Sequence, residues 1–455
     1  MKENATKASL LCTLMLLGIT APAVAHDASP LQAIVSTPPL DTSPGCAIAA
    51  YRDGEIVSST ASGYANLERR IKLDADTQFY AASVSKQFTA LAVMQLVAEG
   101  RLSLDDEVRS HLPELPAYRR PVTVRMLLQH SAGIRDSLSL LRLAGHEHAS
   151  GATMDLATDL VLAQQDTNFE PGTEVRYSNG GYLLLARLVE RITGERFARR
   201  VGRTIFEPLG MDSSFVLDGN VPASSQLAHG YVRTGATFER RDTYPRFGGS
   251  GGVMLTLRDL ARYEYDIEKG KRVWTPQILA LMTEPGILSD GRPAASDDDD
   301  LVYAAGLAVG QRQGYDVVQH GGSAEAFRHA YTRVPSQHLG IAVFCNHSDA
   351  DPQRKVDAAM TALLGPAAGY VAPLPEPGPY RSNELRAHYS VERNGRTITI
   401  TITPDGTSSA PSLLVLRAKS DGSYEGEGVT LRPDGRDLLI GTARAKDLRV
   451  RRIGN

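Results

Sequence analysis

Prolines occupy alternate positions late in the chain, at Pro373, Pro375, Pro377 and Pro379. Proline restricts the backbone angle φ and lacks an N–H group, so a run of alternate prolines disfavours regular helix and sheet structure. We expect a stiff, extended linker over residues 369–379. Because 455 residues are too many for one ordinary domain, we predict a large unit over 26–368 and a small unit over 380–455.

The small unit has the sequence pattern of β-structure. Threonine alternates with isoleucine from Thr397 to Ile402, as expected of a strand with two different faces. Asp-Gly pairs at 405–406, 421–422 and 434–435 mark turns between strands. Short strands joined by such turns predict a barrel or a sandwich, and we expect a small all-β, barrel-like domain.

The large unit begins and ends with strand patterns and is helical between them. Residues 44–60 alternate around an Asp53-Gly54 turn, and apolar strand segments return over 301–346. From Ser83 to Gly194, apolar residues recur mainly at helical spacing. This order predicts an α+β domain whose sheet joins both ends of the unit.

The first residues have the three parts of a secretory signal peptide. Lys2 and Lys7 precede or flank an apolar run over 8–19, and Ala23-Val24-Ala25 matches the cleavage pattern. We therefore expect residues 1–25 to be removed near Ala25, which makes the mature protein secreted or periplasmic. The run is too short to span a bilayer, so no stable membrane span is expected. A net charge of −3 indicates no nucleic-acid partner.

A possible nucleophile opens the first helix of the large unit. In Ser83-Val84-Ser85-Lys86 the lysine follows the serine by three residues, which places both side chains on one helix face. A serine becomes a nucleophile when a nearby base takes its proton. Lysine can be that base if its pKa falls from about 10.4. The spacing alone is weak evidence, because a helix cap beside a surface lysine would look the same.

Two further motifs are also weak individually. Tyr177-Ser178-Asn179 offers a phenol that can transfer protons and an amide that can orient a substrate, but Tyr64-Ala65-Asn66 repeats the spacing in a turn. His320-Gly321-Gly322-Ser323 follows a strand, and its glycines let a substrate lie against the strand edge. The backbone N–H groups of Ser83 and Ser323 would suit an oxyanion hole.

The three motifs, in this order, resemble those of the serine β-lactamase-related family. That group includes class C β-lactamases, D-alanyl-D-alanine carboxypeptidases, D-aminopeptidases and family VIII carboxylesterases. The resemblance covers about residues 35–365 and implies an antiparallel sheet flanked by helices, with a helical lobe. The segments that carry it are AASVSKQFTALAVMQLVAEGRLSLDDEV at 81–108, VTVRMLLQHSAGI at 122–134, YSNGGYLLLARLVERITG at 177–194, IFEPLGM at 205–211 and GGVMLTLRDLARY at 251–263.

The resemblance implies a role for each motif residue. Ser83 would form an acyl-enzyme, and Lys86 and Tyr177 would share the general-base work. Asn179 would hold the amide of the acyl group. The third motif would contact the substrate through His320, Gly321, Gly322 and Ser323. The partner would be a small-molecule or peptide substrate, and neither a metal nor another cofactor would be needed.

The third motif departs from the β-lactamase pattern. Such enzymes usually carry Lys-Thr-Gly, which pairs with a substrate carboxylate, where this chain has His320-Gly321-Gly322. Histidine is only partly charged near neutral pH, and Gly321 removes a hydroxyl donor. The change favours D-aminopeptidase-like or esterase activity and leaves β-lactamase or D-alanyl-D-alanine carboxypeptidase as the alternative. The β-rich tail also loosely resembles the barrel of D-aminopeptidase-like members.

Two other classes of function use the same scaffold. A non-hydrolytic sensor of cell-wall fragments would label at Ser83 at most once, without turnover. A structural protein would be indifferent to Ser83→Ala. The intact serine, lysine and tyrosine favour the enzyme over both.

Three remaining features have modest interpretations. The segment 248–252 satisfies G-x-S-x-G but lacks the strand and helix of a hydrolase elbow, so we expect a glycine-rich wall of the cleft. His130, at a helix end, is expected to be structural. In the family fold the first and last strands of the sheet are neighbours, so we expect Cys46 and Cys345 to form a bridge or to pack as buried thiols.

Overall fold

The computed structural model describes fourteen stretches of the chain. They are residues 30–36, 42–146, 152–221, 224–235, 237–242, 244–295, 301–365, 376–394, 397–406, 410–418, 423–426, 428–434, 436–442 and 445–453. The predicted signal peptide and residues 369–375 of the predicted linker lie outside these stretches.

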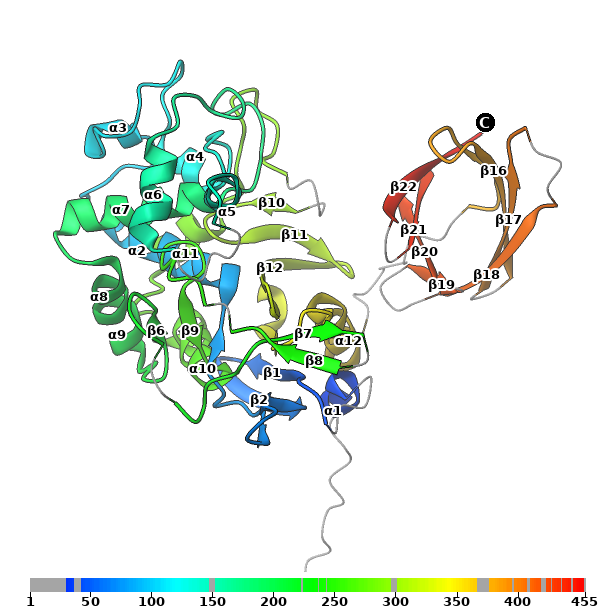
Figure 1. Cartoon of the computed structure of the whole chain (residues 1–455), viewed down its shortest axis with the longest axis horizontal. Helices are drawn as coiled ribbons and strands as arrows, with labels where there is room; N and C mark the ends of the chain where they lie inside the picture. The colour runs from blue at the N-terminus through cyan, green and yellow to red at the C-terminus, as the bar shows by residue number, and fades with distance from the viewer. Residues whose placement is uncertain are drawn as a thin grey trace, which may run out of the picture.

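A sheet joins the two ends of the large unit, as the strand–helix–strand order predicts (Figure 1). Within the described residues it has seven strands in the order β10-β11-β12-β13-β14-β1-β2, and neighbouring strands are antiparallel. Its strands are β1 (Cys46–Arg52), β2 (Glu55–Ser62), β10 (Val302–Tyr303), β11 (Ala308–Arg312), β12 (Tyr315–Ala324), β13 (Phe327–Val334) and β14 (Leu339–Cys345). The predicted α+β class is confirmed.

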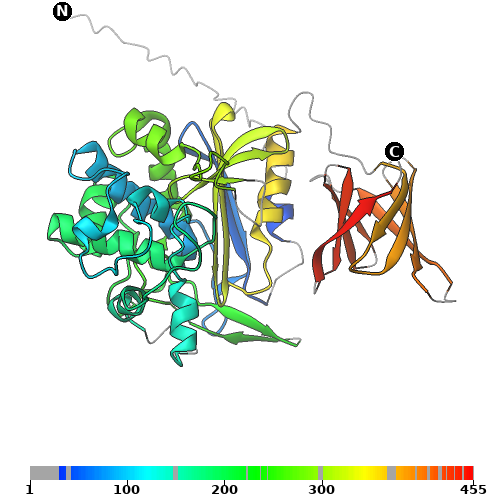
Figure 2. The same cartoon turned by 90° about the horizontal axis from the view of Figure 1, so that it is seen from above.

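Strand β1 shows how one strand supports two cores. Ala47, Ala49 and Tyr51 pack into the core on one face of the sheet, and the alternate residues Cys46 and Ile48 pack into the core on the other. Helices α1 (Pro30–Val35) and α12 (Pro352–Leu364) close this second face, as Figure 2 shows. The tight turn between β1 and β2 uses positive φ at the predicted Asp53-Gly54 pair.

The first and last long strands are joined covalently. Cys46 and Cys345 are direct partners in the register of β1 and β14. They form a disulfide, with the two Cα atoms 4.0 Å apart and a separation of 299 positions along the chain. The expected proximity is therefore confirmed, in its bridged form.

The helical lobe covers the other face of the sheet (Figures 1 and 2). Its central helix is apolar on all sides and is almost entirely buried. Thr123 caps one lobe helix through Met126 N–H, as predicted, and Gly194 ends another in the left-handed conformation. The helices on this side are α2 (Lys86–Ala98), α3 (Val108–His111), α4 (Val124–Leu128), α5 (Ser137–Leu143), α6 (Met154–Leu162), α7 (Asn179–Thr193), α8 (Phe197–Val201), α9 (Glu207–Leu209), α10 (Leu257–Tyr265) and α11 (Pro276–Thr283).

Short strands and single turns connect these helices to the sheet. The 3₁₀ turns are η1 (Ala82–Ser85) and η5 (Pro335–Gln337), and π-helical turns follow α8 (Gly202–Phe206) and α10 (Asp266–Gly270). The strands are β3 (Tyr64–Asn66), β4 (Ile71–Lys72), β5 (Phe79–Tyr80), β6 (Phe215–Val216), β7 (Tyr231–Thr234), β8 (Thr237–Arg240) and β9 (Val253–Leu255).

The small unit is a closed antiparallel barrel, as expected from its alternating sequence. Its strands are β15 (Gly378–Ser382), β16 (Ala387–Asn394), β17 (Thr397–Pro404), β18 (Ser412–Ala418), β19 (Tyr424–Gly426), β20 (Val429–Asp434), β21 (Asp437–Thr442) and β22 (Ala445–Arg452). Figure 2 shows it beyond α12, on the side of the sheet away from the helical lobe. Of the helices in the described part of the chain, none has the length and apolar character that a membrane span requires.

Candidate active site

Ser83 lies where β5 turns directly into η1 and α2. The residue before it, Ala82, has a φ of 47°, a left-handed conformation that costs a residue with a Cβ about 1 kcal/mol or more and is common at functional sites. The turn is held in place because Ala81 N–H donates to Val253 O at 2.9 Å. A Cβ on Gly322 would lie 2.6 Å from Ala81 O, so β12 can pass this closely only with glycine there.

Lys86 is fully buried one helical turn after Ser83, and its amine has three hydrogen-bond partners. Nζ lies 3.2 Å from Ser83 Oγ, 2.8 Å from Asn179 Oδ1 and 2.6 Å from the backbone oxygen of Ser250. The amide and backbone oxygens can only accept hydrogen bonds. A neutral amine therefore gives its two N–H groups to these oxygens, and its lone pair is left facing the Ser83 hydroxyl.

The surroundings of Lys86 favour that neutral form. Burial lowers the pKa of its ammonium from 10.5 to about 7, and the Asp136 carboxylate opposes the shift. A base with a pKa near 7 is deprotonated in part at neutral pH and still basic enough to take a proton in a transition state. The arrangement can thus activate Ser83.

The pKa of Tyr177 is shifted in the direction that disfavours a role as base. Its ring packs against Lys86, with Nζ 4.7 Å from the ring centroid. Burial raises the pKa of the phenol well above 10, and the neighbouring Tyr303 raises it further, while the Ser83 hydroxyl acts in the opposite direction. The phenol is therefore protonated at neutral pH. Of the two residues expected to share the base role, the structure favours Lys86, and Tyr177 is suited to donate or relay a proton.

Asn179 is oriented by a residue that the sequence analysis missed. The carboxylate oxygen Oδ2 of Asp136 accepts hydrogen bonds from the backbone N–H and the side-chain Nδ2 of Asn179, both at 2.9 Å. This contact directs Asn179 Oδ1 towards Lys86. Asp136 also caps α5 by accepting from Ser139 N–H. A cap before an apolar helix is visible in the sequence, but the contact with a residue 43 positions away is not.

His320 lies in β12 and is buried. Its Nδ1 is 2.6 Å from Gly321 O, an acceptor, so Nδ1 carries the proton. Burial, followed by the charge of Lys86, lowers the pKa of the imidazole to about 4, which makes it neutral at pH 7. Its Nε2 is then an acceptor, and among the described residues this buried atom has no hydrogen-bond partner.

His130 supports the tyrosine motif, in agreement with the structural role expected for it. Its Nδ1 accepts a hydrogen bond from Ser178 N–H at 3.1 Å, and its ring stacks on Tyr177 with centroids 4.3 Å apart. Burial lowers its pKa well below 6.5. His130 is thus a neutral side chain that positions the start of α7.

His329 holds the serine turn from the sheet side, and no sequence pattern around it indicates this role. Its Nε2–H donates to Tyr80 O at 2.8 Å, and its Nδ1 accepts from Cys345 N–H at 3.3 Å. Burial lowers its pKa to about 3, which suits these two bonds because they require the neutral ring. The ring also lies where a Cβ on Gly322 would meet it. His329 therefore connects the Ser83 turn with the His-Gly-Gly strand.

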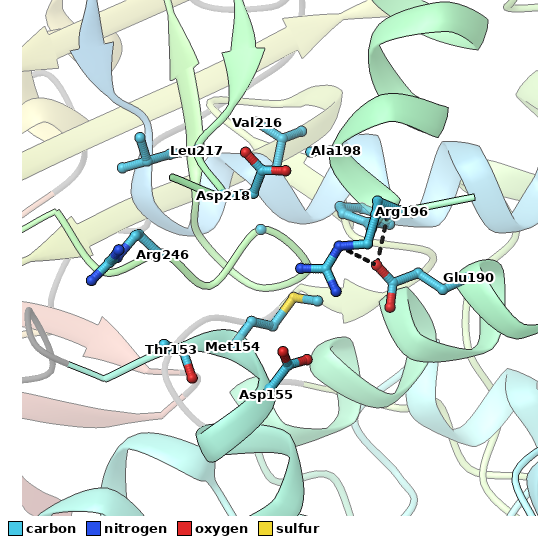
Figure 3. A pocket seen from close by; sticks show the side chains of 12 residues that line it. Thr153, Met154, Asp155, Glu190, Arg196, Ala198, Val216, Leu217, Asp218 and Arg246 are labelled. Atoms are coloured by element: carbon cyan, nitrogen blue, oxygen red, sulfur yellow. Dashed lines mark hydrogen bonds and ion pairs between the residues drawn. The ribbon is translucent and has the colours of Figure 1, made fainter. Parts of the chain in front are cut away.

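The glycine-rich segment 248–252 forms a wall of the site, as expected. Its Ser250 carbonyl accepts from Lys86, and its Gly249 carbonyl accepts from Thr89. A Cβ on Gly249 would lie 2.5 Å from Tyr182 O, so the loop packs directly on α7. Outside it, a cavity of about 160 Å³ is bordered by Arg246, Gly248 and the Glu190–Arg196 contact, as Figure 3 shows, and contains no predicted site residue.

A larger cavity, of about 720 Å³, opens at the tyrosine motif. Tyr177 and Asn179 form one part of its wall, and the carboxylate-bearing Asp136 lies beside them. The other lining residues are Arg135, Ser139, Leu140, Leu143, Gln164, Asn168 and Arg176. The cavity adjoins Tyr177 and Asn179 of the tyrosine motif and combines apolar, anionic and cationic surfaces.

Comparison with known proteins agrees with this fold and arrangement. Residues 37–365 match the model of the Beta-lactamase family. A D-aminopeptidase of Cereibacter sphaeroides is 28% identical over 435 residues, which cover 92% of this chain and 79% of the relative. The octameric penicillin-binding protein homologue from Pyrococcus abyssi has the same fold, with a TM-score of 0.64 at 24% identity over 90% of this chain and 96% of its own.

A third relative extends the comparison to another reaction. EstCE1, a hydrolase with promiscuous acyltransferase activity, superposes with a TM-score of 0.60 at 25% identity, over 70% of this chain and 93% of its own. The fold and the family match define a serine hydrolase of the β-lactamase and penicillin-binding type. This chain belongs to the Beta-lactamase family.

Proposed function

We propose that this protein hydrolyses amides of D-amino acids through an acyl-enzyme on Ser83. The observation that carries the proposal is the geometry at Lys86, where two acceptors take the N–H groups and leave the lone pair facing Ser83 Oγ at 3.2 Å. An active serine needs a base in this position. A purely structural protein, or a binding protein that is not acylated at Ser83, has no need of it.

The first half of the reaction forms the ester. Lys86 takes the proton from Ser83 Oγ, which attacks the substrate carbonyl carbon. The backbone N–H groups of Ser83 and Ser323 stabilise the oxyanion. The C–N bond then breaks, and the leaving amine takes the proton from Lys86 through the Tyr177 hydroxyl.

The second half releases the acid. Water gives a proton to Lys86 and attacks the ester carbon, and Ser83 Oγ leaves and takes that proton back. Asn179 holds Lys86 in line throughout, because its own amide is held by Asp136. Both halves are acid–base chemistry of this chain's side chains.

The third motif supports a substrate without a carboxylate at the scissile bond. The Nε2 atom of His320 is an acceptor, and the ring is neutral at pH 7. A lysine in this place would attract a carboxylate, whereas an acceptor suits a substrate N–H. Gly321 adds no hydroxyl donor. The position has room for a larger residue, because it is exposed and a Cβ there would meet only His329 O, at 3.6 Å.

The cavity beside Asn179 supports a free amino group on the substrate. Asp136 lines this cavity next to the amide that would hold the acyl group, and Arg135 and Arg176 line it as well. A substrate ammonium beside Asp136 would gain favourable charge interaction with its carboxylate. Leu140 and Leu143 offer apolar surface for a side chain. The D-aminopeptidase relative supports the same substrate class.

Intact-mass measurement after treatment with a fluorophosphonate, together with turnover assays, tests the proposal. We expect one adduct on the wild type, none on Ser83→Ala, and faster turnover of D-Ala-p-nitroanilide than of its L-isomer or its N-acetylated form. p-Nitrophenyl butyrate and nitrocefin serve as comparison substrates. Faster turnover of the N-acetylated amide would contradict the role of Asp136, and adduct formation without turnover of any substrate would favour a sensor.

Esterase activity is the second candidate, because the neutral His320 places no demand on the leaving group and EstCE1 shares the fold. Preferred turnover of p-nitrophenyl butyrate over D-Ala-p-nitroanilide would select it. Nitrocefin as the best substrate would instead select a β-lactamase.

We also propose that the protein is exported after cleavage near Ala25. The Cys46–Cys345 disulfide supports this, since such bonds persist in oxidising compartments. N-terminal sequencing of the mature protein tests it, and a retained Met1 would contradict it.

A further inference from the structure

A second cavity with a histidine, an aspartate and a cysteine lies on the face of the sheet away from Ser83. It measures about 530 Å³ and is lined by Cys46, His347 and Asp349, with further residues from α1 and α12. Cys46 belongs to the core that α1 and α12 close, and not to the core beneath the helical lobe. The cavity is therefore separate from the hydrolase site.

Three side chains in this cavity form an ordered series. The Nε2 atom of His347 lies 3.9 Å from Cys46 Sγ, and its Nδ1 lies 2.6 Å from Asp349 Oδ1. A carboxylate accepts, so the neutral ring carries its proton on Nδ1 and directs the Nε2 lone pair at the sulfur. Arg233 holds the other oxygen of Asp349 at 2.5 Å. A base oriented in this way beside a cysteine is the arrangement that produces a reactive thiolate.

Cationic side chains outnumber carboxylates in the lining of this cavity. Arg233, Arg354 and Lys355 line the cavity together with Asp349 and Asp351. Positive charge stabilises a thiolate and attracts anionic molecules. Both cysteines are fully buried, but Cys46 lines the cavity and Cys345 does not, so the two sides of the disulfide differ in their position relative to the cavity.

We propose that Cys46 and Cys345 form a thiol–disulfide exchange site for small, carboxylate-bearing thiols and disulfides, with Cys46 as the attacking cysteine and Cys345 as the resolving one. In the reduced protein, His347 takes the Cys46 proton, and the thiolate attacks an external disulfide RS–SR. Cys46–S–S–R forms and RS⁻ leaves. The Cys345 sulfur then attacks Cys46 Sγ, the second RS⁻ leaves, and the protein disulfide closes. Two electrons pass from the protein dithiol to RS–SR, which becomes two RSH with the two thiol protons.

Differential alkylation tests the assignment of the two cysteines. The full protein is reduced with dithiothreitol, desalted and treated with N-ethylmaleimide, and peptide mass spectrometry then follows each cysteine. We expect Cys46 to react at least about tenfold faster than Cys345, and His347→Gln and Asp349→Asn to slow Cys46 by about tenfold through the lost thiolate. His388→Gln is the matched control, because His388 also pairs with an aspartate, Asp405, but in the barrel. Equal labelling, or no effect of His347→Gln, would overturn the proposal.

Trapping the mixed disulfide tests the exchange itself. Cys345→Ser leaves Cys46 without its resolving partner, so oxidised glutathione should give one stable glutathione adduct on Cys46. Cys46→Ser should give none, and cystamine, which carries ammonium groups, should react more slowly than glutathione disulfide. Circular dichroism verifies that each variant is folded. A folded Cys345→Ser protein that forms no adduct would reject the site, and faster reaction with cystamine would reject the anionic preference.

Discussion

The two faces of the seven-stranded sheet differ in the polarity of the side chains that are buried against them. On the helical-lobe face, the rings of His130 and His320 lie beside Tyr177, and the buried atoms His130 Nε2 and His320 Nε2 have no hydrogen-bond partner among the described residues. On the opposite face, α1 and α12 pack an apolar core and a disulfide joins β1 to β14. On that face, the buried side-chain polar atom without a hydrogen-bond partner among the described residues is Thr332 Oγ1.

This difference indicates which face of the sheet can hold a binding or catalytic site. Buried polar atoms without partners cost stability, so a folded protein keeps a cluster of them where a ligand completes the hydrogen bonds. The opposite face instead contributes stability through apolar burial and a covalent link, and the exchange chemistry proposed there is confined to that link. Strand β1 serves both because consecutive residues point to opposite faces.

Ser83→Ala gives the largest expected effect and tests whether hydrolysis is confined to the lobe face. Turnover should fall by roughly 10³-fold or more, since the nucleophile is lost. Ser250→Ala is the matched control: it belongs to the G-x-S-x-G segment, but Lys86 uses only its backbone oxygen, which the alanine retains. A greater loss in Ser250→Ala than in Ser83→Ala would move the nucleophile to the glycine-rich loop.

Lys86 links activity and stability on the lobe face. Because the pKa of Lys86 in the folded protein is about 7, kcat/KM for the wild type should rise as pH increases through 7, when the amine becomes neutral. Lys86→Met should reduce turnover by about 10²-fold or more, as expected for loss of a general base.

The same substitution should stabilise the fold. The unfolded chain binds the Lys86 proton up to about pH 10.4, whereas the folded chain releases it near pH 7, so wild-type stability rises between these values. We expect Lys86→Met to be more stable by about 1–3 kcal/mol at pH 6, with the gain shrinking towards pH 10. Urea unfolding at both pH values measures it, and an equal gain at both would reject a buried amine with a lowered pKa.

His329 tests how the sheet positions the serine turn. His329→Leu leaves Tyr80 O and Cys345 N–H without their side-chain partner, at a cost of about 1–3 kcal/mol for each buried group. We expect kcat to fall by about 10- to 100-fold with KM nearly unchanged, since a displaced turn harms the transition state most. His329→Gln keeps a donor for Tyr80 O and should recover part of kcat. Equal kcat in both variants would show that the ring acts only by filling space.

Arg354 gives the smallest expected effect and lies on the opposite face. Its guanidinium is 3.4 Å from Glu425 of the barrel, and both side chains are exposed. Exposed ion pairs contribute about 0–1 kcal/mol, so Arg354→Ala should change neither turnover nor the melting temperature appreciably. A change in kcat of tenfold or more would mean that the barrel influences the lobe face. It would contradict the conclusion that the two faces of the sheet act independently.

Much of the fold could be predicted because its signals are local. The alternation in residues 397–402 gives the barrel strand β17, the Asp53-Gly54 pair gives the turn between β1 and β2, and Thr123 gives the cap of α4. Each depends on neighbours within a few residues. The motifs around Ser83, Tyr177 and His320 are equally local, so their grouping could be expected from the family resemblance.

Contacts between distant segments could not be predicted in this way. His329 reaches Tyr80 across 249 positions and Lys86 reaches Asn179 across 93. Asp136 has the sequence signal of a helix cap, and nothing in its neighbours indicates that it also orients Asn179. Such pairs depend on how β5, α5 and α7 are packed, which no short pattern encodes.

The sequence by itself determined the family, the order of the elements and the three motifs, because spacing along the chain is enough to define them. Only the tertiary structure decided which side chain is suited to act as the base for Ser83. Burial lowers the pKa of Lys86 to about 7 and raises that of Tyr177 above its usual range, and burial is a property of the packed molecule. The same packing made His320 neutral and set His347 beside Cys46, because a side chain's charge depends on the groups that folding brings to it.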